Sequence, residues 1–371
     1  MMEGSFDPAF RRLADRFAAS LDGGERGAVA VRIAGRTMVD LRGGRIDPQA
    51  AALWRPDTLA CVFSVTKGVI SLLAHRLIDK GVLSPSARVA SVWPEFAAEG
   101  KADITVQDVL THSAGLPAVS SPVVRGDLYD WDRMVEALAA SAPVCPLRAA
   151  PVYHNMTYGH LLGEILCRAA RVRPLSRLLS TEVTCPLNAD FRLGLSPSDI
   201  ARTARMAGAD PASLFAALRS APESLFARSM AFFAEGEDFN SSSWRRAEIG
   251  SGSGHATALG VAVLYEAMIG PGFLSAERRS ALADLQTASD GADPILGIPL
   301  RYGAGVELSL PPGIDFGPSP HALGHWGAGG ATGFADPGAG LAFGYVTGEM
   351  AGGMGSSDRA RTLVAALYDC L

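Results

Sequence analysis

The sequence predicts an α/β fold: an antiparallel sheet built from N- and C-terminal segments and flanked by helices, with an inserted, mainly helical domain. Strand patterns occur near both ends of the chain, helical patterns broken by proline- and glycine-rich stretches fill the middle, and a helical pattern lies at each terminus. With 371 residues, 48% of them hydrophobic and 19% charged, the chain can bury a large core. We place the α/β domain at residues 1–85 and 286–371, and the inserted helical domain at 86–285.

The first elements are a helix and a pair of strands. Asp7-Pro8 is expected to open the helix and Gly23 to close it. Residues 27–44 alternate apolar and β-branched positions with polar ones, which predicts two strands joined at residues 34–36. The helix is expected to dock on the sheet through apolar residues at helical spacing: Phe10, Leu13, Ala14, Phe17 and Leu21.

A second helix is predicted after Ser64, and it ends at the glycine stop of Lys80-Gly81. Within the insert, residues 157–170 and 255–270 have the clearest helical patterns. The last element, residues 356–371, is a helix with Ser or Asp at its start. Four late segments are expected to be strands that complete the sheet: 302–308, 322–329, 330–337 and 340–348.

Composition and absent motifs exclude several classes of function. A net charge of -5 argues against nucleic-acid binding, and no apolar run is long enough to span a membrane. The N-terminus does not resemble a signal peptide, because arginines interrupt it. The motifs Gly-x-Ser-x-Gly, His-Glu-x-x-His, Gly-Lys-Ser/Thr and Gly-x-Gly-x-x-Gly are absent, so we expect no metal and no cofactor. The five cysteines are scattered and form no CxxC pair, which fits a reducing cytoplasm.

Chemistry is suggested by Ser64 and Lys67, which share a helix face three residues apart. Only three of the 33 basic residues are lysines, and the other thirty are arginines. A buried lysine can become a neutral base, which arginine cannot. Ser64 would lie beside the free N–H groups of the helix start, where an oxygen can carry negative charge. Ser-x-x-Lys also arises by chance, however, and the alternative is a helix cap followed by a solvated lysine.

Four blocks in order make the chain resemble a known family. The stretch "FSVTKG" is similar to the active-site helix of the serine β-lactamase and penicillin-binding-protein superfamily. With "GKADITVQDVLTHSAGLP", "YHNMTYGHLLGEIL" and "GHWGAGGATGFADPGAGLAFGYV", the closest resemblance is to the class C β-lactamase-like carboxylesterases, or family VIII esterases. The resemblance implies that Ser64 is the nucleophile and Lys67 its base. In "LTHSAGLP", His112 is expected to fix a turn.

The resemblance assigns the catalytic tyrosine to Tyr153 and a substrate-binding role to Asn155. Tyr153 would share proton transfer with Lys67, which is expected to stabilise the phenolate. Asn155 would hydrogen-bond Lys67 or the carbonyl side of the acyl group. From the residues alone, Tyr153 could instead be a core tyrosine and Asn155 a helix cap.

The third block places His325, Trp326 and Gly327 on a strand that lines the pocket and binds substrate. The backbone N–H groups of Ser64 and Ala328 would form the oxyanion hole. β-Lactamases have a lysine and a threonine that bind the drug's carboxylate, so a neutral histidine and a tryptophan favour neutral esters. Trp326 would wall an acyl pocket, or simply pack within the strand.

The resemblance therefore implies a cytoplasmic serine esterase that hydrolyses short-chain carboxylic esters through an acyl-enzyme, with weak β-lactam hydrolysis possible. Its expected partner is a small-molecule ester, with no nucleic acid and no membrane. The alternatives are an acyltransferase or amidase that uses the same site, and a non-catalytic ligand-binding member of the fold. The sequence leaves the natural substrate, the acyl chain length and the oligomeric state open.

Overall fold

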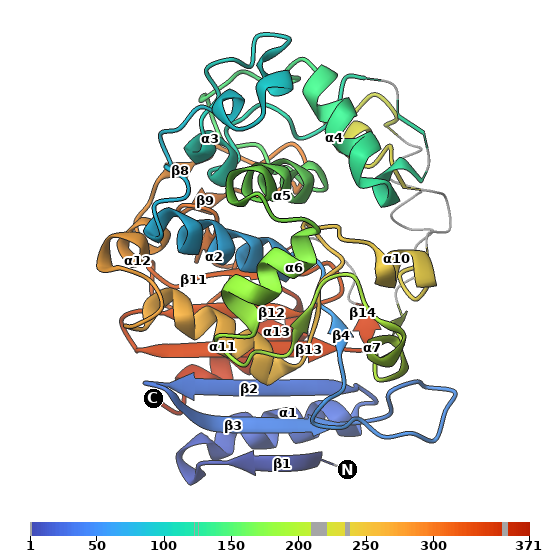
Figure 1. The fold of residues 1–371 in the computed structure, drawn as a ribbon. Coiled ribbons are helices and arrows are strands. Elements are labelled where there is room, and N and C mark those ends of the chain that lie inside the picture. The colour runs from blue at the N-terminus through green and yellow to red at the C-terminus, as the bar shows by residue number, and fades with distance from the viewer. Residues whose placement is uncertain (1, 122, 125, 209–220, 234–237, 351–354) are drawn as a thin grey trace.

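A computed structural model describes residues 2–121, 123–124, 126–208, 221–233, 238–350 and 355–371. Within these residues the fold centres on a nine-stranded antiparallel sheet (Figure 1). Its strands, in spatial order, are β1 (Met2–Phe6), β3 (Arg36–Gly43), β2 (Gly27–Ile33), β13 (Leu341–Thr347), β12 (Thr332–Asp336), β11 (Leu323–Trp326), β10 (Glu307–Leu308), β9 (Arg301–Tyr302) and β8 (Thr287–Ala288). The central pair of β2 and β13 joins the two ends of the chain, which confirms the predicted sheet.

The two faces of this sheet differ in side-chain size. Large residues of β2 and β13, such as Val31 and Phe343, face the terminal helices α1 (Arg11–Asp22) and α13 (Asp358–Tyr368). The opposite face carries alanine and glycine, and a Cβ on Gly344 would lie 2.2 Å from a backbone oxygen of the covering helix. Small residues therefore allow the second helical layer to approach the sheet closely.

That second layer consists of α2 (Val65–Asp79) and α11 (Ala258–Ile269), with α12 (Ala276–Ala283) beside them (Figure 1). Residues 255–270 were predicted to belong to the insert, but in the structure α11 packs directly on β2, β12 and β13. Its period was recognised correctly. The element against which it packs was not recognised, because the sequence of an almost wholly apolar helix does not show which face contacts which neighbour.

The inserted region is mainly helical, as predicted, and much of it lies on the side of α2 away from β2 and β13 (Figure 1). Its helix α5 (Thr157–Ala170) packs against α2. The other α-helices among the described residues of this region are shorter: α3 (Val106–Leu110), α4 (Trp131–Ala140), α6 (Leu175–Leu179), α7 (Pro197–Ala201), α9 (Leu225–Ser229) and α10 (Ser242–Arg246).

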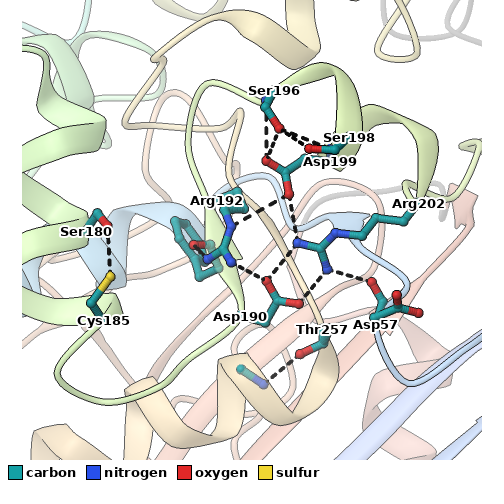
Figure 2. Close-up of polar contacts among 12 residues, drawn as sticks. Asp57, Ser180, Cys185, Asp190, Arg192, Ser196, Ser198, Asp199, Arg202 and Thr257 are labelled. Carbon is teal, nitrogen blue, oxygen red and sulfur yellow. Dashed lines mark hydrogen bonds and ion pairs between the residues drawn. The ribbon is translucent and has the colours of Figure 1, made fainter.

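Small sheets and ion pairs join the insert to the rest of the chain. One sheet has the order β4 (Ala60–Cys61), β7 (His255–Ala256), β5 (Phe191–Arg192), and the other pairs β14 (Glu349–Met350) with β6 (Ala207–Gly208). Beside the first sheet, Arg202 binds the carboxylates of Asp190 and Asp199 and the backbone oxygen of Asp57 at 2.7 Å (Figure 2). These contacts hold Asp57, which lies just before β4, and Ser64 follows soon after that strand.

The local predictions at the N-terminus are confirmed in outline. Asp7 caps a short 3-10 turn that leads into α1, and Gly23 ends this helix. The β2–β3 turn places Ala34 and Gly35 at φ 48 and 82, in the left-handed region that such a tight turn requires. Strand β1 was missed, because its sequence "MEGSF" has no run of β-branched residues, and it forms by pairing with β3 along the sheet edge.

Candidate active site

Ser64 is the cap residue at the start of α2, at the end of a strained connection. The preceding residue, Phe63, has a φ of 45, which is rare for a residue with a bulky side chain. Helix α2 is buried along most of its length, and Gly68 lets Tyr265 of α11 approach, because a Cβ there would lie 2.2 Å from the phenol oxygen. Ser64 is therefore held on a rigid, deeply packed helix, while its own side chain keeps partial exposure.

Lys67 lies one turn further along α2 and is fully buried. Its Nζ lies 3.0 Å from Ser64 Oγ and 2.9 Å from the backbone oxygen of Ser251. Burial lowers the pKa of Lys67 to about 7, while the negative charge of Glu307 opposes this change. Near neutral pH the amine is therefore poised to accept a proton from the hydroxyl beside it.

The Ser251 oxygen that binds Lys67 is held by α5. Ser251 Oγ accepts a hydrogen bond of 2.6 Å from the Gly159 N–H and donates one of 2.8 Å to the Met156 oxygen. Gly159 permits this contact, because a Cβ on it would lie 2.2 Å from the Ser251 nitrogen. The insert thus supplies the second acceptor of Lys67.

Tyr153 lies at the same centre, with its ring centroid 4.8 Å from Lys67 Nζ. Its backbone N–H donates to the buried Asp293 carboxylate at 2.9 Å. The prediction that Lys67 stabilises the phenolate is wrong, because burial and the charge of Glu307 raise the pKa of Tyr153 well above its usual value. The hydroxyl of Ser64 lies near enough to offset part of this rise, without a hydrogen bond of full geometry. Tyr153 is therefore a neutral phenol, able to donate a proton rather than to accept one.

Two histidines hold the segment that carries Tyr153. His112 Nδ1 accepts a hydrogen bond of 2.9 Å from the His154 N–H, and its ring stacks on Tyr158 at 4.6 Å between centroids. His154 Nε2 accepts a hydrogen bond of 3.0 Å from the Leu116 N–H. His112 has a φ of 57 and lies in a turn, where the sequence analysis expected a structural residue.

Asn155 lies beside this centre but does not bind Lys67 in the structure. Its side-chain nitrogen instead lies 2.9 Å from the sulfur of Met230, a weak acceptor. Of the two partners predicted for Asn155, the amine is therefore not contacted in the structure, and Lys67 Nζ has the backbone oxygen of Ser251 as an acceptor instead.

The end of β11 approaches the start of α2, as expected for the third block. A Cβ on Gly327 would lie 2.4 Å from the Val62 oxygen, so only glycine permits this contact. The N–H groups of Ser64 and Ala328 donate to no acceptor among the described residues, and Ala328 is exposed. Two free N–H groups at the meeting point of a helix start and a strand end form an arrangement that can stabilise a developing oxyanion.

His325 and Trp326 are both buried next to this strand end. Burial lowers the pKa of His325 to about 3, so its imidazole is neutral as predicted, and its Nδ1 lies 2.8 Å from the Trp326 oxygen. Trp326 is 3% exposed and belongs to the core that also contains Tyr153. Of the two roles predicted for Trp326, this burial favours packing within the strand over lining an acyl pocket.

Sequence reasoning missed Ser251, Asp293 and Glu307, although each contacts or influences the Ser64–Lys67–Tyr153 cluster. Ser251 acts through its backbone oxygen, which gives no signal in side-chain identity. Glu307 carried a usable signal, as an acid in a stretch that is otherwise apolar and glycine-rich, whereas Asp293 lies only three residues after another acid, Asp290.

Within the described residues, no cluster of three or more His, Cys, Asp or Glu side chains could hold a metal ion. In the same part of the chain, no helix has both the length and the apolar character needed to cross a bilayer.

The β-lactamase family matches residues 10–367. Esterase/beta-lactamase LipL of Mycobacterium tuberculosis is 32% identical over 386 aligned residues, which cover 96% of this chain and 85% of that protein. Crystal structures of a family VIII carboxylesterase and of a penicillin-binding protein homologue from Caulobacter crescentus are each 32% identical over all of both chains, with TM-scores of 0.90 and 0.88. The chain belongs to the β-lactamase family.

Proposed function

We propose that this protein is a serine esterase that hydrolyses short-chain carboxylic esters through an acyl-enzyme on Ser64. The observation that carries the proposal is the 3.0 Å contact between Ser64 Oγ and a fully buried Lys67 whose pKa is lowered to about 7. The esterase names of LipL and of the carboxylesterase neighbour favour esters as the substrate class.

In the proposed acylation, Ser64 Oγ attacks the ester carbonyl carbon while its proton passes to Lys67. The carbonyl oxygen becomes an oxyanion between the Ser64 and Ala328 N–H groups. The carbon–oxygen bond to the alcohol then breaks, and the alcohol leaves with a proton from Tyr153, which regains one from Lys67. Water then attacks the acyl carbon, and its proton passes to Tyr153 while Tyr153 gives its own proton to Lys67. Lys67 returns a proton to Ser64 Oγ as the bond between this oxygen and the acyl carbon breaks, which releases the carboxylic acid and regenerates Ser64.

The proposal is tested with p-nitrophenyl acetate. We expect a burst of p-nitrophenol equal to the enzyme concentration if deacylation is slow, an acetyl adduct on Ser64 by mass spectrometry, and neither in Ser64→Ala. Nitrophenol release that survives in Ser64→Ala would contradict the proposal. Alcohols or amines added as acceptors distinguish hydrolysis from acyl transfer, and amide substrates test the amidase alternative.

A preference for neutral esters is part of the same proposal. His325 is uncharged at neutral pH and fully buried, so the position where β-lactamases have a lysine supplies no cation for a carboxylate. We expect kcat/KM for nitrocefin to be at least about 10-fold below that for p-nitrophenyl acetate, since a lost hydrogen bond to a charged group is worth about 1.5–3 kcal/mol. Comparable values for the two substrates would refute the preference.

A further inference from the structure

Glu307 is an acid enclosed by the molecule next to the Ser64–Lys67–Tyr153 cluster. It lies on β10 opposite Gly324 of β11, and its side chain is fully buried. Neither carboxyl oxygen has a hydrogen-bond partner among the described residues. A buried acid without hydrogen bonds destabilises a fold, so its presence calls for another explanation.

A short series of contacts connects this carboxyl group to the reacting groups. Glu307 Oε2 lies 3.7 Å from His325 Nδ1. The His325 ring lies 6.0 Å from the Tyr153 ring, and Lys67 Nζ lies 4.8 Å from that ring. The indole and backbone N–H groups of Trp326 also face the carboxyl group.

The charged groups around Glu307 show which one acts on it most. Burial raises the pKa of Glu307 well above its usual value, and Lys67 is the main group that opposes this rise. In turn, the charge of Glu307 opposes the lowering of the Lys67 pKa by burial. His325 has its pKa lowered to about 3 and carries no charge. The other titratable groups that face Lys67 or Glu307 are neutral or acidic: His112, His154, Tyr153, Tyr265, Tyr302 and Asp293. Among the described residues, Lys67 is thus the cation whose charge most affects Glu307.

We propose that Glu307 is a positioning residue whose buried carboxyl group is the countercharge of Lys67, and that it makes this amine a stronger base toward Ser64. The inference rests on the proposed function. When Lys67 takes the serine proton, an ammonium ion forms on a fully buried side chain. Burial raises the pKa of Glu307, but the ammonium charge favours its ionised form, and this carboxylate then stabilises the ion without moving. His325 lies beside the carboxyl group as a neutral neighbour and does not compete for its charge.

The test compares wild type with Glu307→Gln, which has the same shape without the charge, and with Glu307→Asp, which keeps the charge. For kcat/KM on p-nitrophenyl acetate we expect the acid limb of Glu307→Gln to move about one pH unit lower, because removal of a nearby opposite charge lowers the pKa of an amine. Its plateau should fall about three- to tenfold, because the amine is then a weaker base. Glu307→Asp should retain the wild-type limb.

Structural damage alone would lower the plateau of the kcat/KM pH profile and leave its acid limb at the same pH. A Glu307→Gln limb that coincides with wild type therefore overturns the inference. The rate at which a fluorophosphonate labels Ser64 gives a second profile that needs no ester turnover: the serine oxygen bonds to phosphorus, fluoride leaves and Lys67 takes the proton. Failure of the wild type both to hydrolyse the ester and to be labelled would refute the proposed function instead.

If Glu307→Gln folds too poorly for kinetic measurements, stability provides a second test. The double variant Lys67→Met/Glu307→Gln removes both members of the pair, whereas each single variant leaves one member without its countercharge. We expect the urea midpoint of the double variant to lie above the value that the two single changes predict by addition. Additive midpoints would overturn the inference.

Discussion

The surroundings of Lys67 and of Lys101 differ in a way that explains why only one of these buried lysines is suited to catalysis. Both side chains are fully buried, and both ammonium groups lie near an aromatic ring, at 4.8 Å from that of Tyr153 and 5.3 Å from that of Phe96. Burial is the main cause that lowers the pKa of each. Burial and aromatic contact therefore do not separate them.

Their hydrogen-bond partners do. Lys101 Nζ donates to three backbone oxygens, those of Ala98, Ala139 and Ser141, which match the three donors of an ammonium group. Lys67 Nζ has one backbone oxygen and the hydroxyl of Ser64, which can itself give up a proton. Three carbonyl acceptors stabilise the ammonium form of Lys101, whereas the hydroxyl beside Lys67 is a group that a neutral amine can deprotonate.

The largest expected effect is the loss of activity in Lys67→Arg. Arginine keeps the charge but cannot accept a proton, so kcat/KM for p-nitrophenyl acetate should fall at least about 1,000-fold, within the usual range for a lost general base. Circular dichroism and the urea midpoint should remain close to wild type, and Lys67→Met should show the same loss. Turnover within tenfold of wild type would show that Lys67 is not the base.

The matched change at the other lysine should affect stability instead. Lys101→Met leaves three buried backbone oxygens without their donor, which should lower the free energy of unfolding by about 2–4 kcal/mol in urea titration. The kcat/KM of the remaining folded protein should stay within about twofold of wild type, because the site does not contain Lys101. A large loss of activity with unchanged stability would invalidate the contrast between the two lysines.

The pH dependence of the wild type sharpens the same contrast. Since the pKa of Lys67 is lowered to about 7, its neutral form dominates above pH 7. The value of kcat/KM should therefore fall about tenfold per pH unit below 7 and level off above it. Tyr153 should add no descending limb before alkaline pH, because its pKa is raised. A profile that stays flat from pH 5 to 9 would argue against an amine base.

Much of the fold and the core of the candidate site could be predicted from sequence because the signals are local. The three-residue spacing of Ser64 and Lys67 on one helix fixes their proximity whatever surrounds them. The rarity of lysine was a weaker guide than it seemed. It drew attention to Lys67, but Lys101 is equally buried and binds only backbone oxygens.

The remainder depends on tertiary contacts that no local pattern encodes. The neutrality of Tyr153 follows from its burial and from Glu307, which lies 154 positions further along the chain. The partner of Asn155 is likewise a distant residue, Met230. Helix α11 was recognised as a helix, yet only the packed structure shows that it covers the sheet.

The smallest expected effect is that of Asn155→Ala, which tests whether Lys67 depends on Ser64 and Ser251 alone. In the structure the Asn155 amide donates to a sulfur atom and makes no contact with the amine, so its loss should leave the acid limb of the pH profile in place. Any role in holding the substrate carbonyl would appear as a fall in kcat/KM of no more than about tenfold, the value of one neutral hydrogen bond. Should the acid limb move by a full unit, Asn155 would join Ser251 as a partner of Lys67 during turnover, and the difference from the fully satisfied Lys101 would be smaller than the resting structure indicates.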